Sequence, residues 1–600
     1  MASVPYGYAL PIASTFLGYQ LLKCISKRGG LDILGASFPV GMTLTSIISM
    51  LSNFIGVTSS FVVAQILGAI TLGVIFFMIG RKRTIYLKFP KTITIIILII
   101  YIVLLSYISY IAYGEKGKII STGLNDCLLE FAYIASFANG TNKHSNFING
   151  VKLPLFSENQ AKTEYLPSFY SAMMVVTGSL TEHAVLIQTV LLFSSIVILQ
   201  YYLTYKISNN EFVSVLSVPV AFLLGGFGFL NFINNTEDRY NANLDFVFNY
   251  GKNSYNVWGH PILHCFITSR PALLTFSLSL TVLNLLQSNG LIFSGILVLF
   301  CTIVRVQSGF ILTIMYLFYF PSTFNLKHLL IKAICIIPTV LYIIYTGFKP
   351  KITNQYMFSF QSYSKSLLPP VKFSLSVFGF LFPVLTFSFF NKKLIYRTII
   401  SLIIFYLFTF VTLHNEIRYN FFELISTILP LIISLSYSGM ISFTKLFKKE
   451  HRSIFHTLIF FITFFMCISS IIGIYQKIQQ KMPIWDDVDY ETAEYIMNNT
   501  NETDVFVGAS HYGCGWSPAI VIAGRQSFYE NSAALHSSLY DNNDHFNRIT
   551  MFMNTKQGKL NANFFIARKM DEWEGRLNQM IGTIVDVLYA NDKYTIYKYV

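Results

Sequence analysis

Residues 92–113 have the sequence TITIIILIIYIVLLSYISYIAY, which contains no charged side chain. A helix needs about 20 mostly apolar residues to cross the hydrocarbon core of a bilayer, so this stretch predicts a transmembrane helix. Similar runs recur along most of the chain and predict about 14 spans, two of them short. The predicted spans lie near residues 5–22, 33–55, 57–80, 92–113, 183–204, 212–231, 271–288, 291–304, 306–321, 329–346, 370–390, 398–413, 420–440 and 453–475.

The composition of the 600-residue chain supports a polytopic membrane protein. Hydrophobic residues make up 53% of it and charged residues only 12%, with a mean hydropathy of +0.53. A soluble chain is about one quarter charged, which excludes a cytosolic enzyme and a disordered protein. The seven cysteines show no CxxC and no Cys/His ligand spacing, which excludes a zinc module and a secreted disulfide scaffold.

The net charge of +14 comes largely from short basic tracts between the apolar runs. Short Lys/Arg-rich loops mark the cytoplasmic side of a membrane protein. The sequence lacks the basic stretches interleaved with aromatic residues that are typical of nucleic-acid binding, so we expect no nucleic-acid partner. The tracts contain Lys23, Lys27 and Arg28; Arg81, Lys82, Arg83, Lys88 and Lys91; Lys392, Lys393 and Arg397; and Lys445, Lys448, Lys449 and Arg452.

The alternation of spans then places both termini on the lumenal or external side. Segments 114–182, 232–270, 347–369 and 476–600 fall on that side too. N-glycosylation sequons at Asn139, Asn234, Asn498 and Asn501 all lie in these segments. We therefore expect an integral protein of the endoplasmic reticulum and secretory pathway or of the plasma membrane.

The chain divides into a transmembrane domain, 1–475, with large external loops at 114–182 and 232–270, and an external domain, 476–600. Segment 114–182 contains GLNDCLLEFAYIASFANG and EYLPSFYSAMMVVTG, whose helical apolar spacing predicts helices along or dipping into the outer membrane surface. The tail predicts a helix at DDVDYETAEYIMNN, strands at DVFVGAS and PAIVIAGRQSFY, and a C-terminal hairpin. The fold class is thus mostly α, with a small C-terminal α/β domain.

Ionisable residues cluster at the external ends of the spans, which predicts a reaction or binding site at the outer membrane boundary. Asp126 and Glu130 are four residues apart, so a helix places both on one face. This pair fits two interpretations: a general base with a metal ligand, or a solvated helix face.

Three basic residues near the apolar runs are further candidates, each with a structural alternative. Arg305, with Gln307, interrupts the run 291–321; it fits a lipid-phosphate contact or a turn whose arginine snorkels to the interface. Arg270, before a predicted span, fits a ligand or an interface anchor. His264 lies beside the same span and fits a ligand or a local hydrogen bond.

The order of several sequence blocks resembles the GT-C superfamily of membrane glycosyltransferases, within a poorly characterised multispanning subgroup. The blocks are the acidic loop at Asp126; Ser136, Phe137 and Gly140; Tyr165 and Phe169; Gly226 to Leu230; Arg270 and Pro271; and Ala493, Glu494, Ile496, Ala523, Gly524 and Arg525. The chain departs from this pattern at Glu130 and at Arg305-Val306-Gln307, where relatives tend to have histidines.

The resemblance implies transfer of a sugar from a polyprenyl-phosphate donor to a glycan or protein acceptor. Membrane lipid would be a further partner. Asp126 would be the base or a ligand of a divalent cation, Mg or Mn, with Glu130 as its helper. Arg270 or Arg305 would contact the phosphate, and Gln307, Tyr165 and His264 would line the substrate site. Two alternatives stay open: a transporter or flippase for a lipid or small solute, and a catalytically silent relative.

Overall fold

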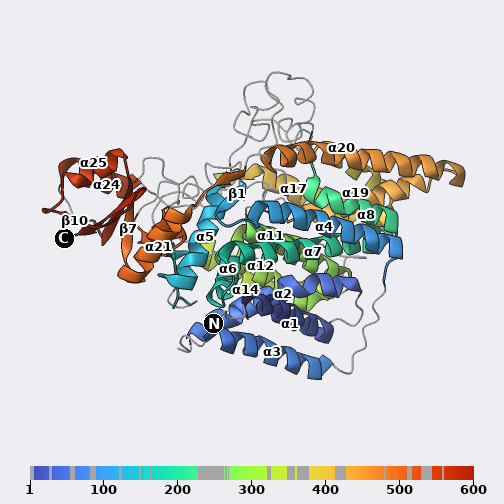
Figure 1. Cartoon of the computed structure of the whole chain (residues 1–600). Coiled ribbons are helices and arrows are strands. Elements are labelled where there is room, and N and C mark those ends of the chain that lie inside the picture. Colours follow the sequence, from blue (N-terminus) through green and yellow to red (C-terminus); the bar gives the residue numbers. More distant parts are fainter. Residues whose placement is uncertain are drawn as a thin grey trace, which may run out of the picture.

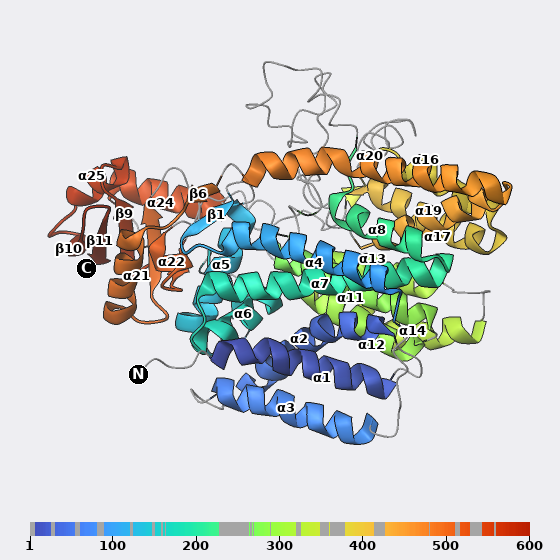
Figure 2. The same cartoon turned by 45° about the vertical axis from the view of Figure 1, so that its right-hand side comes forward.

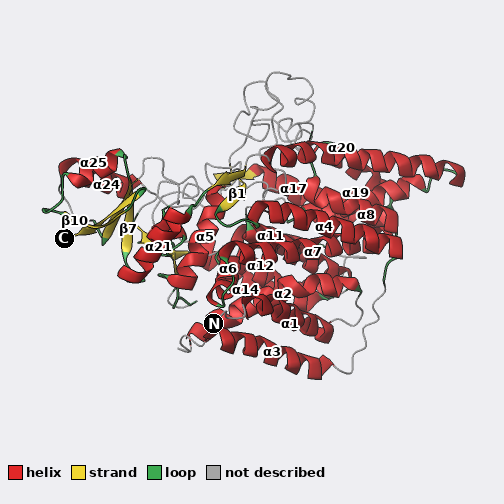
Figure 3. Cartoon of the chain, in the orientation of Figure 1, coloured by secondary structure: helices red, strands yellow, loops and turns green. Residues whose placement is uncertain are grey.

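The computed structural model is mostly helical, with a small C-terminal mixed sheet (Figures 1 and 3). It describes residues 6–25, 30–54, 61–80, 89–120, 124–146, 150–155, 157, 160–161, 164–226, 263, 267, 269–288, 290–319, 326–347, 359–360, 378–412, 427–478, 481–509, 517–528, 543–556 and 560–600. All structural statements below concern these residues.

The helices up to residue 478 form what we call the helical body. They are η1 (Tyr6–Tyr8), α1 (Ala9–Ile25), α2 (Leu31–Phe54), α3 (Phe61–Gly80), α4 (Thr92–Tyr113), α5 (Leu124–Asn139), α6 (Leu166–Val176), α7 (Thr181–Ser208), α8 (Glu211–Leu223), α11 (Arg270–Gln287), α12 (Leu291–Val304), α13 (Val306–Phe318), α14 (Leu326–Gly347), α16 (Leu381–Leu385), η3 (Thr386–Phe390), α17 (Lys392–Phe410), α19 (Leu429–Thr444), η4 (Lys449–His451) and α20 (Arg452–Ile478).

Five of the described helices, α2, α4, α7, α14 and α20, are long and apolar enough to cross a membrane by length and composition. Helices α4, α14 and α20 expose many large apolar side chains, among them Ile93, Ile334 and Phe460, which suits a lipid environment. Helix α7 lies at the centre, packed against α2, α4, α11 and α19 (Figure 2). The protein is therefore a plausible integral membrane protein, and the count of about 14 spans stays a prediction.

One region differs from the simple span that we expected, and a second one has the two short helices expected at 291–304 and 306–321. In the described part of the run 370–390, the short α16 is followed directly by η3, and the helical segment ends at Asn391, whose backbone is extended. Helices α12 and α13 form an antiparallel hairpin, since the Tyr316 hydroxyl donates to the Leu291 carbonyl at 2.8 Å. The hairpin turns at Arg305, whose backbone is extended.

Polar contacts join helix ends on two opposite sides of the body. At one end, Lys206 Nζ lies 2.6 Å from Asp32 Oδ2, and Lys206 also donates to the Asn284 carbonyl. At the other end, the backbone N–H of Gly117 donates to Glu182 at 3.1 Å. Because α7 runs from Glu182 to Lys206, these contacts define the two ends of the body.

The tail (Asp486–Val600) lies at the Glu182 end of the body, beside α5 (Figures 1 and 2). Its five-stranded sheet has the order β10-β11-β9-β7-β8, with β7 parallel to both its neighbours and the remaining pairs antiparallel. The tail contains α21 (Asp487–Asn499), β7 (Val505–Ala509), α22 (Pro518–Val521), β8 (Gln526–Ser527), α24 (Asn543–Thr555), β9 (Phe564–Arg568), α25 (Glu572–Asn578), β10 (Val585–Ala590) and β11 (Tyr594–Tyr599). Three short pairs complete the strands: β1 (Lys118–Ile120) with β6 (Lys481–Pro483), β2 (Val151–Lys152) with β3 (Gln160–Ala161), and β4 (Ser359–Phe360) with β5 (Val411–Thr412).

The structure confirms the predicted helix at α21 and the predicted C-terminal hairpin β10–β11. The predicted strand at PAIVIAGRQSFY is largely wrong: Pro518 starts the short helix α22, and only Gln526–Ser527 are in a strand. Proline fixes the backbone angle that the first turn of a helix needs, which favours this outcome over a continuous strand.

The two helices that we expected on the membrane surface are instead packed inside the molecule. Residues 130–138 of α5 and 166–174 of α6 are buried, including the polar side chains of Ser136, Ser168 and Ser171. The reason is tertiary: α22 of the tail covers α5, and α2 and α7 pack against α6. A helix with one polar face does not need solvent when another element supplies its partners.

Helices α1 and α2 cross at two glycines. A Cβ on Gly41 would lie 1.7 Å from the Ser14 carbonyl oxygen, and one on Gly18 would lie 2.0 Å from the Ser37 carbonyl oxygen. Only glycine permits such close backbone contact, as in small-residue crossings of membrane helices.

We expect Gly41→Leu to push α1 away from α2 and to lower the free energy of unfolding by about 1–3 kcal/mol or more, as overpacking does. Thermal unfolding in lipid nanodiscs measures this effect. Gly68→Leu on α3 is the matched control, since a Cβ at Gly68 meets nothing within 4 Å. Equal unfolding temperatures for the two variants would contradict the close crossing.

Candidate functional site

Helix α5 carries the two predicted acidic site residues. Asp126 lies in the first turn of α5, where the structure describes the backbone alone, so its side chain is outside the described part. Glu130 follows one turn later and is 5% exposed. The solvated-face interpretation of Glu130 is therefore excluded.

Glu130 and Arg270 form a buried ion pair. Glu130 Oε1 accepts the backbone N–H of Arg270 at 2.7 Å, and Oε2 accepts the Arg270 guanidinium. Arg270 Nη1 donates to the Tyr113 hydroxyl at 3.0 Å, and that hydroxyl donates to the Ile267 carbonyl. The pair thus joins α5 to the first residue of α11 and to the last residue of α4.

Burial makes this pair costly to break. Arg270 is only 1% exposed, and removing one partner of a buried ion pair leaves an uncompensated charge, at about 3–5 kcal/mol. The oxygens of Glu130 and the guanidinium of Arg270 are thus engaged with each other. This arrangement fixes the direction in which α5 leaves the body.

A second arginine–glutamate pair lies at the tip of the α12–α13 hairpin. Arg305 Nε is 3.0 Å from Glu164 Oε1, with Arg305 buried and Glu164 about one third exposed. The Glu164 N–H donates to the Val304 carbonyl at 2.9 Å, and Glu164 has a positive φ of 72°. A non-glycine residue in this conformation is strained, and such strain is often found at functional sites.

Two predicted substrate-site residues lie beside this pair. Tyr165 follows Glu164 and is buried, with its ring 6.3 Å from that of Phe137 on α5. Phe169 approaches the same ring at 5.1 Å, so two blocks of the resemblance meet in one aromatic cluster. Gln307 is half-buried beside Arg305, and its Oε1 has no hydrogen-bond partner among the described residues.

Two further blocks, almost 400 residues apart, meet where the tail docks on α5. A Cβ on Gly140 would lie 1.8 Å from the Gly524 carbonyl oxygen, and Gly524 has a positive φ of 73°. Arg525, 1% exposed, donates to the carbonyls of Asn139, Ala523, Met497 and Thr500. Burial lowers the pKa of Arg525 from its ordinary value, but these contacts hold its guanidinium between α5 and α21.

Glu182 is a buried carboxylate that the sequence analysis missed. Besides Gly117, it accepts the Tyr490 hydroxyl of α21 at 3.1 Å, while Lys116 Nζ lies 3.8 Å from the centre of the Tyr490 ring. Burial and the adjacent Glu182 raise the pKa of Tyr490, so this phenol stays a donor. A glutamate in the first turn of an apolar helix was the available signal, because a charge there needs a partner.

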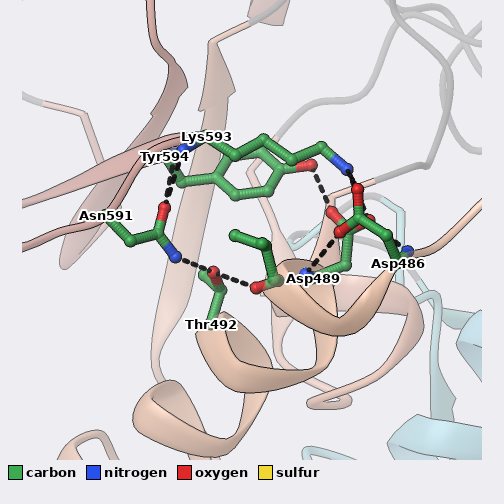
Figure 4. A network of polar contacts seen from close by, with 7 residues as sticks. Asp486, Asp489, Thr492, Asn591, Lys593 and Tyr594 are labelled. Carbon is green, nitrogen blue, oxygen red and sulfur yellow. Dashed lines mark hydrogen bonds and ion pairs between the residues drawn. The ribbon is translucent and has the colours of Figure 1, made fainter.

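Figure 4 shows a polar network that locks the start of α21 to the last hairpin. Asp489, 1% exposed, accepts Lys593 Nζ at 2.5 Å and the Tyr594 hydroxyl at 2.7 Å. Lys593 also reaches Asp486 Oδ2 at 3.1 Å, and Asp486 caps the helix by accepting the Asp489 N–H. Burial and the hydrogen bond to Asp489 raise the pKa of Tyr594. Within the tail, charge-assisted hydrogen bonds therefore hold helix α21 to the β10–β11 hairpin.

The other features predicted from the sequence are His264, the four sequon asparagines and a metal site. His264 and Asn234 lie outside the described residues. Asn139, Asn498 and Asn501 are all exposed, as a glycosylated asparagine must be. No three His, Cys, Asp or Glu side chains gather into a metal site within the described ranges. Arg270 binds both carboxylate oxygens of Glu130, so Glu130 has no free oxygen to offer a cation at Asp126. The cation site at Asp126 stays a prediction from the sequence.

Comparisons with known proteins give a distant likeness. No family model matches the chain, and no curated protein matches it. Among solved structures, the Archaeoglobus fulgidus oligosaccharyltransferase in complex with Zn and sulfate is 13% identical, covering 78% of this chain and 68% of that chain, with a TM-score of 0.42. AglB from the same organism, an archaeal oligosaccharyltransferase in complex with an inhibitory peptide and a dolichol-phosphate, is 12% identical over 80% and 70%, with a TM-score of 0.40. At these values neither likeness assigns a function.

We expect Gly524→Ala to loosen the tail from α5, because its Cβ would lie 2.3 Å from the Ala135 carbonyl oxygen at a backbone angle that alanine avoids. Limited proteolysis between α21 and α22 should accelerate. Gly575→Ala is the matched control, since a Cβ there meets nothing within 4 Å. Unchanged cleavage in Gly524→Ala would refute the tight contact.

The Lys593 network predicts an acid-sensitive tail. Burial alone raises the pKa of Asp486, but hydrogen bonds from Lys593 and Asp489 outweigh it, so that pKa is below its ordinary value. Such a group adds stability above the unfolded pKa of about 3.9 and loses it as the pH falls through the folded pKa. The wild-type tail should therefore unfold at lower temperature below about pH 4, and Lys593→Met should reduce this acid-dependent drop.

Tryptophan fluorescence measures this unfolding, because three of the four tryptophans, Trp485, Trp516 and Trp573, lie at or beyond the start of the tail. Lys598→Met, at an exposed position of β11, is the control. An identical pH dependence in Lys593→Met and wild type would show that the network does not couple to protonation.

Proposed function

We propose that this protein is a membrane glycosyltransferase that transfers a sugar from a polyprenyl-phosphate donor to an acceptor at the lumenal or external membrane face. The observation that carries the proposal is that two glutamate–arginine pairs, Glu130–Arg270 and Glu164–Arg305, are both attached to α5 or to its aromatic cluster. Charged groups at the end of an apolar helical body are costly, and a phosphate-linked lipid substrate would account for the arginine at the hairpin tip, Arg305.

Asp126 is the proposed general base. It lies one helical turn before Glu130, on the same face of α5. A hydroxyl or amide acceptor loses a proton as it attacks the anomeric carbon, and a carboxylate in hydrogen-bond reach takes it. Glu130 is engaged by Arg270, so we assign Glu130 and Arg270 to positioning α5 rather than to proton transfer.

Arg305 is the proposed phosphate contact. The polyprenyl phosphate leaves as an anion, and a guanidinium at the leaving oxygen stabilises the developing charge. Arg305 is held at a hairpin tip, next to the half-buried Gln307. Tyr165 and the aromatic cluster lie beside it and offer an apolar and stacking wall for the sugar.

The topology proposed from the basic tracts places this site on the lumenal or external side. The described basic residues Lys445 and Lys448 follow α19 at the Lys206–Asp32 end of the body, where Ser438 donates to the Ile207 carbonyl, and the Glu130–Arg270 end lies opposite. The tail, which carries two of the exposed sequon asparagines, Asn498 and Asn501, docks at the site end. This arrangement supports an acceptor that approaches from the lumen or from outside the cell.

The test uses purified full-length protein in lipid nanodiscs with a panel of radiolabelled polyprenyl-phosphate sugars. Asp126→Asn should reduce transfer by about 10²–10⁴-fold, the usual contribution of a general base. Arg305→Gln should raise the donor KM and lower kcat. Asp592→Asn, at an exposed tail position, should retain wild-type transfer.

The other outcomes are equally informative. Transfer that persists in Asp126→Asn would keep the enzyme class and refute the assigned base. No transfer by wild-type protein with any donor, while a supplied glycan or peptide acceptor is present, would favour a transporter or a silent relative. Glu130→Gln should lower the unfolding temperature together with activity, as expected of a positioning residue.

A further inference from the structure

A second cationic cluster lies at the opposite end of the body, where α13, α14 and α17 meet. Two of its members are deeply buried: Lys332 on α14 is 0% exposed and Arg397 on α17 is 9% exposed. The cluster is at the Lys206–Asp32 end, because Gln287 near the end of α11 donates to the Tyr319 hydroxyl while the neighbouring Asn284 carbonyl accepts Lys206. It is therefore separate from the candidate glycosyltransferase site.

Tyr319, directly after α13, is the centre of the cluster. Lys332 Nζ donates to the Tyr319 carbonyl at 2.5 Å, and so satisfies one of the free carbonyls at the end of α13. The Arg397 guanidinium lies 5.6 Å from the centre of the Tyr319 ring. Lys332 thus has a structural partner in the helix end, which leaves the charge of Arg397 to be explained.

The contacts of Arg397 do not neutralise its charge. Its Nε atom is buried and has no hydrogen-bond partner, and no carboxylate lies within 4 Å of its guanidinium among the described residues. A tyrosine ring and hydroxyl are weak compensation for a guanidinium in an apolar helix body. An anion at this position would complete the hydrogen bonding.

The first turn of α17, which precedes Arg397, is also positively charged. Lys392 and Lys393 are exposed in the first turn of α17, and this turn has no acidic residue. Cations at the N-terminus of a helix add to the positive charge of that end of the helix dipole. A bound anion would offset this positive charge. Tyr396, also exposed, donates its hydroxyl to the Phe318 carbonyl at 3.2 Å and so ties α17 to the end of α13.

Apolar side chains continue from this positive surface along the outside of the body. Ile399 and Ile403 of α17 and Leu330 and Ile334 of α14 are all strongly exposed. A ligand that bears a phosphate and acyl chains would match both parts of this surface. Basic pockets between transmembrane helices on the cytoplasmic side bind anionic lipid headgroups in this manner.

We propose that the α13–α14–α17 junction binds a phosphate group of an anionic lipid, with Arg397 as the buried contact and Lys392 and Lys393 as the outer contacts. The lipid chains lie along the exposed faces of α14 and α17. Free inorganic phosphate shares the same headgroup chemistry, and the experiment below separates the two sources.

The test compares full-length protein in nanodiscs of phosphatidylcholine alone with nanodiscs that also contain phosphatidic acid, by native mass spectrometry and thermal unfolding. Wild type should retain phosphatidic acid after release from the nanodisc and should unfold at higher temperature in its presence. Each basic contact near an anionic surface is worth about fivefold in affinity, so Lys392→Gln with Lys393→Gln should weaken retention by about twenty-fivefold. Arg397→Gln should remove it.

Lys445→Gln with Lys448→Gln, which removes two exposed cations from another basic loop, is the charge-matched control and should retain phosphatidic acid as wild type does. Equal retention by the control and the Lys392/Lys393 variant would overturn the proposal, and this arm holds even where Arg397→Gln fails to fold. Inorganic phosphate should not shift the unfolding of wild type in neutral nanodiscs; a shift that Arg397→Gln lacks would assign the site to soluble phosphate.

Discussion

The ion pair between Glu130 and Arg270 joins the end of α4, the middle of α5 and the start of α11, and both of its side chains are buried. The end of α4 and helix α5, which are close in the sequence, thus meet the start of α11, 140 residues beyond Glu130, at one guanidinium. Removing one partner of a buried ion pair costs about 3–5 kcal/mol, so this geometry is strongly fixed. The direction of α5, the position of Asp126 on it and the surface that α5 offers to the tail all depend on this pair.

The tail depends in turn on α5. Gly140 and Gly524 permit backbone contact between the two, and Arg525 binds carbonyls from both α5 and α21. Tyr490 adds a bond from α21 to Glu182 at the start of α7. The tail is therefore attached to the same end of the body as the candidate site, and its docking and the geometry of α5 are expected to be coupled.

The two ends of the body treat charge differently. At the α5 end, arginines are paired with glutamates of the chain itself, in Glu130–Arg270 and Glu164–Arg305. At the opposite end, Lys206 is paired with Asp32, while Arg397 lies against a tyrosine ring and below two exposed lysines. A buried guanidinium requires an anion: Arg270 and Arg305 each have a carboxylate of the chain, and Arg397 receives a lipid phosphate in our proposal.

The sequence by itself determined the helical class of the protein, most of the helix positions, the tail helix α21 and the last hairpin, because apolar periodicity and turn residues are local signals. It also singled out Glu130, Arg270 and Arg305, since charges beside apolar runs need partners. It did not determine which charges pair: Glu130 with Arg270 and Glu164 with Arg305 are contacts over 140 residues each. The burial of α5 and α6, the part played by Glu182, and the helix α22 in place of a strand were decided only in the tertiary structure, because each depends on what a distant segment packs against.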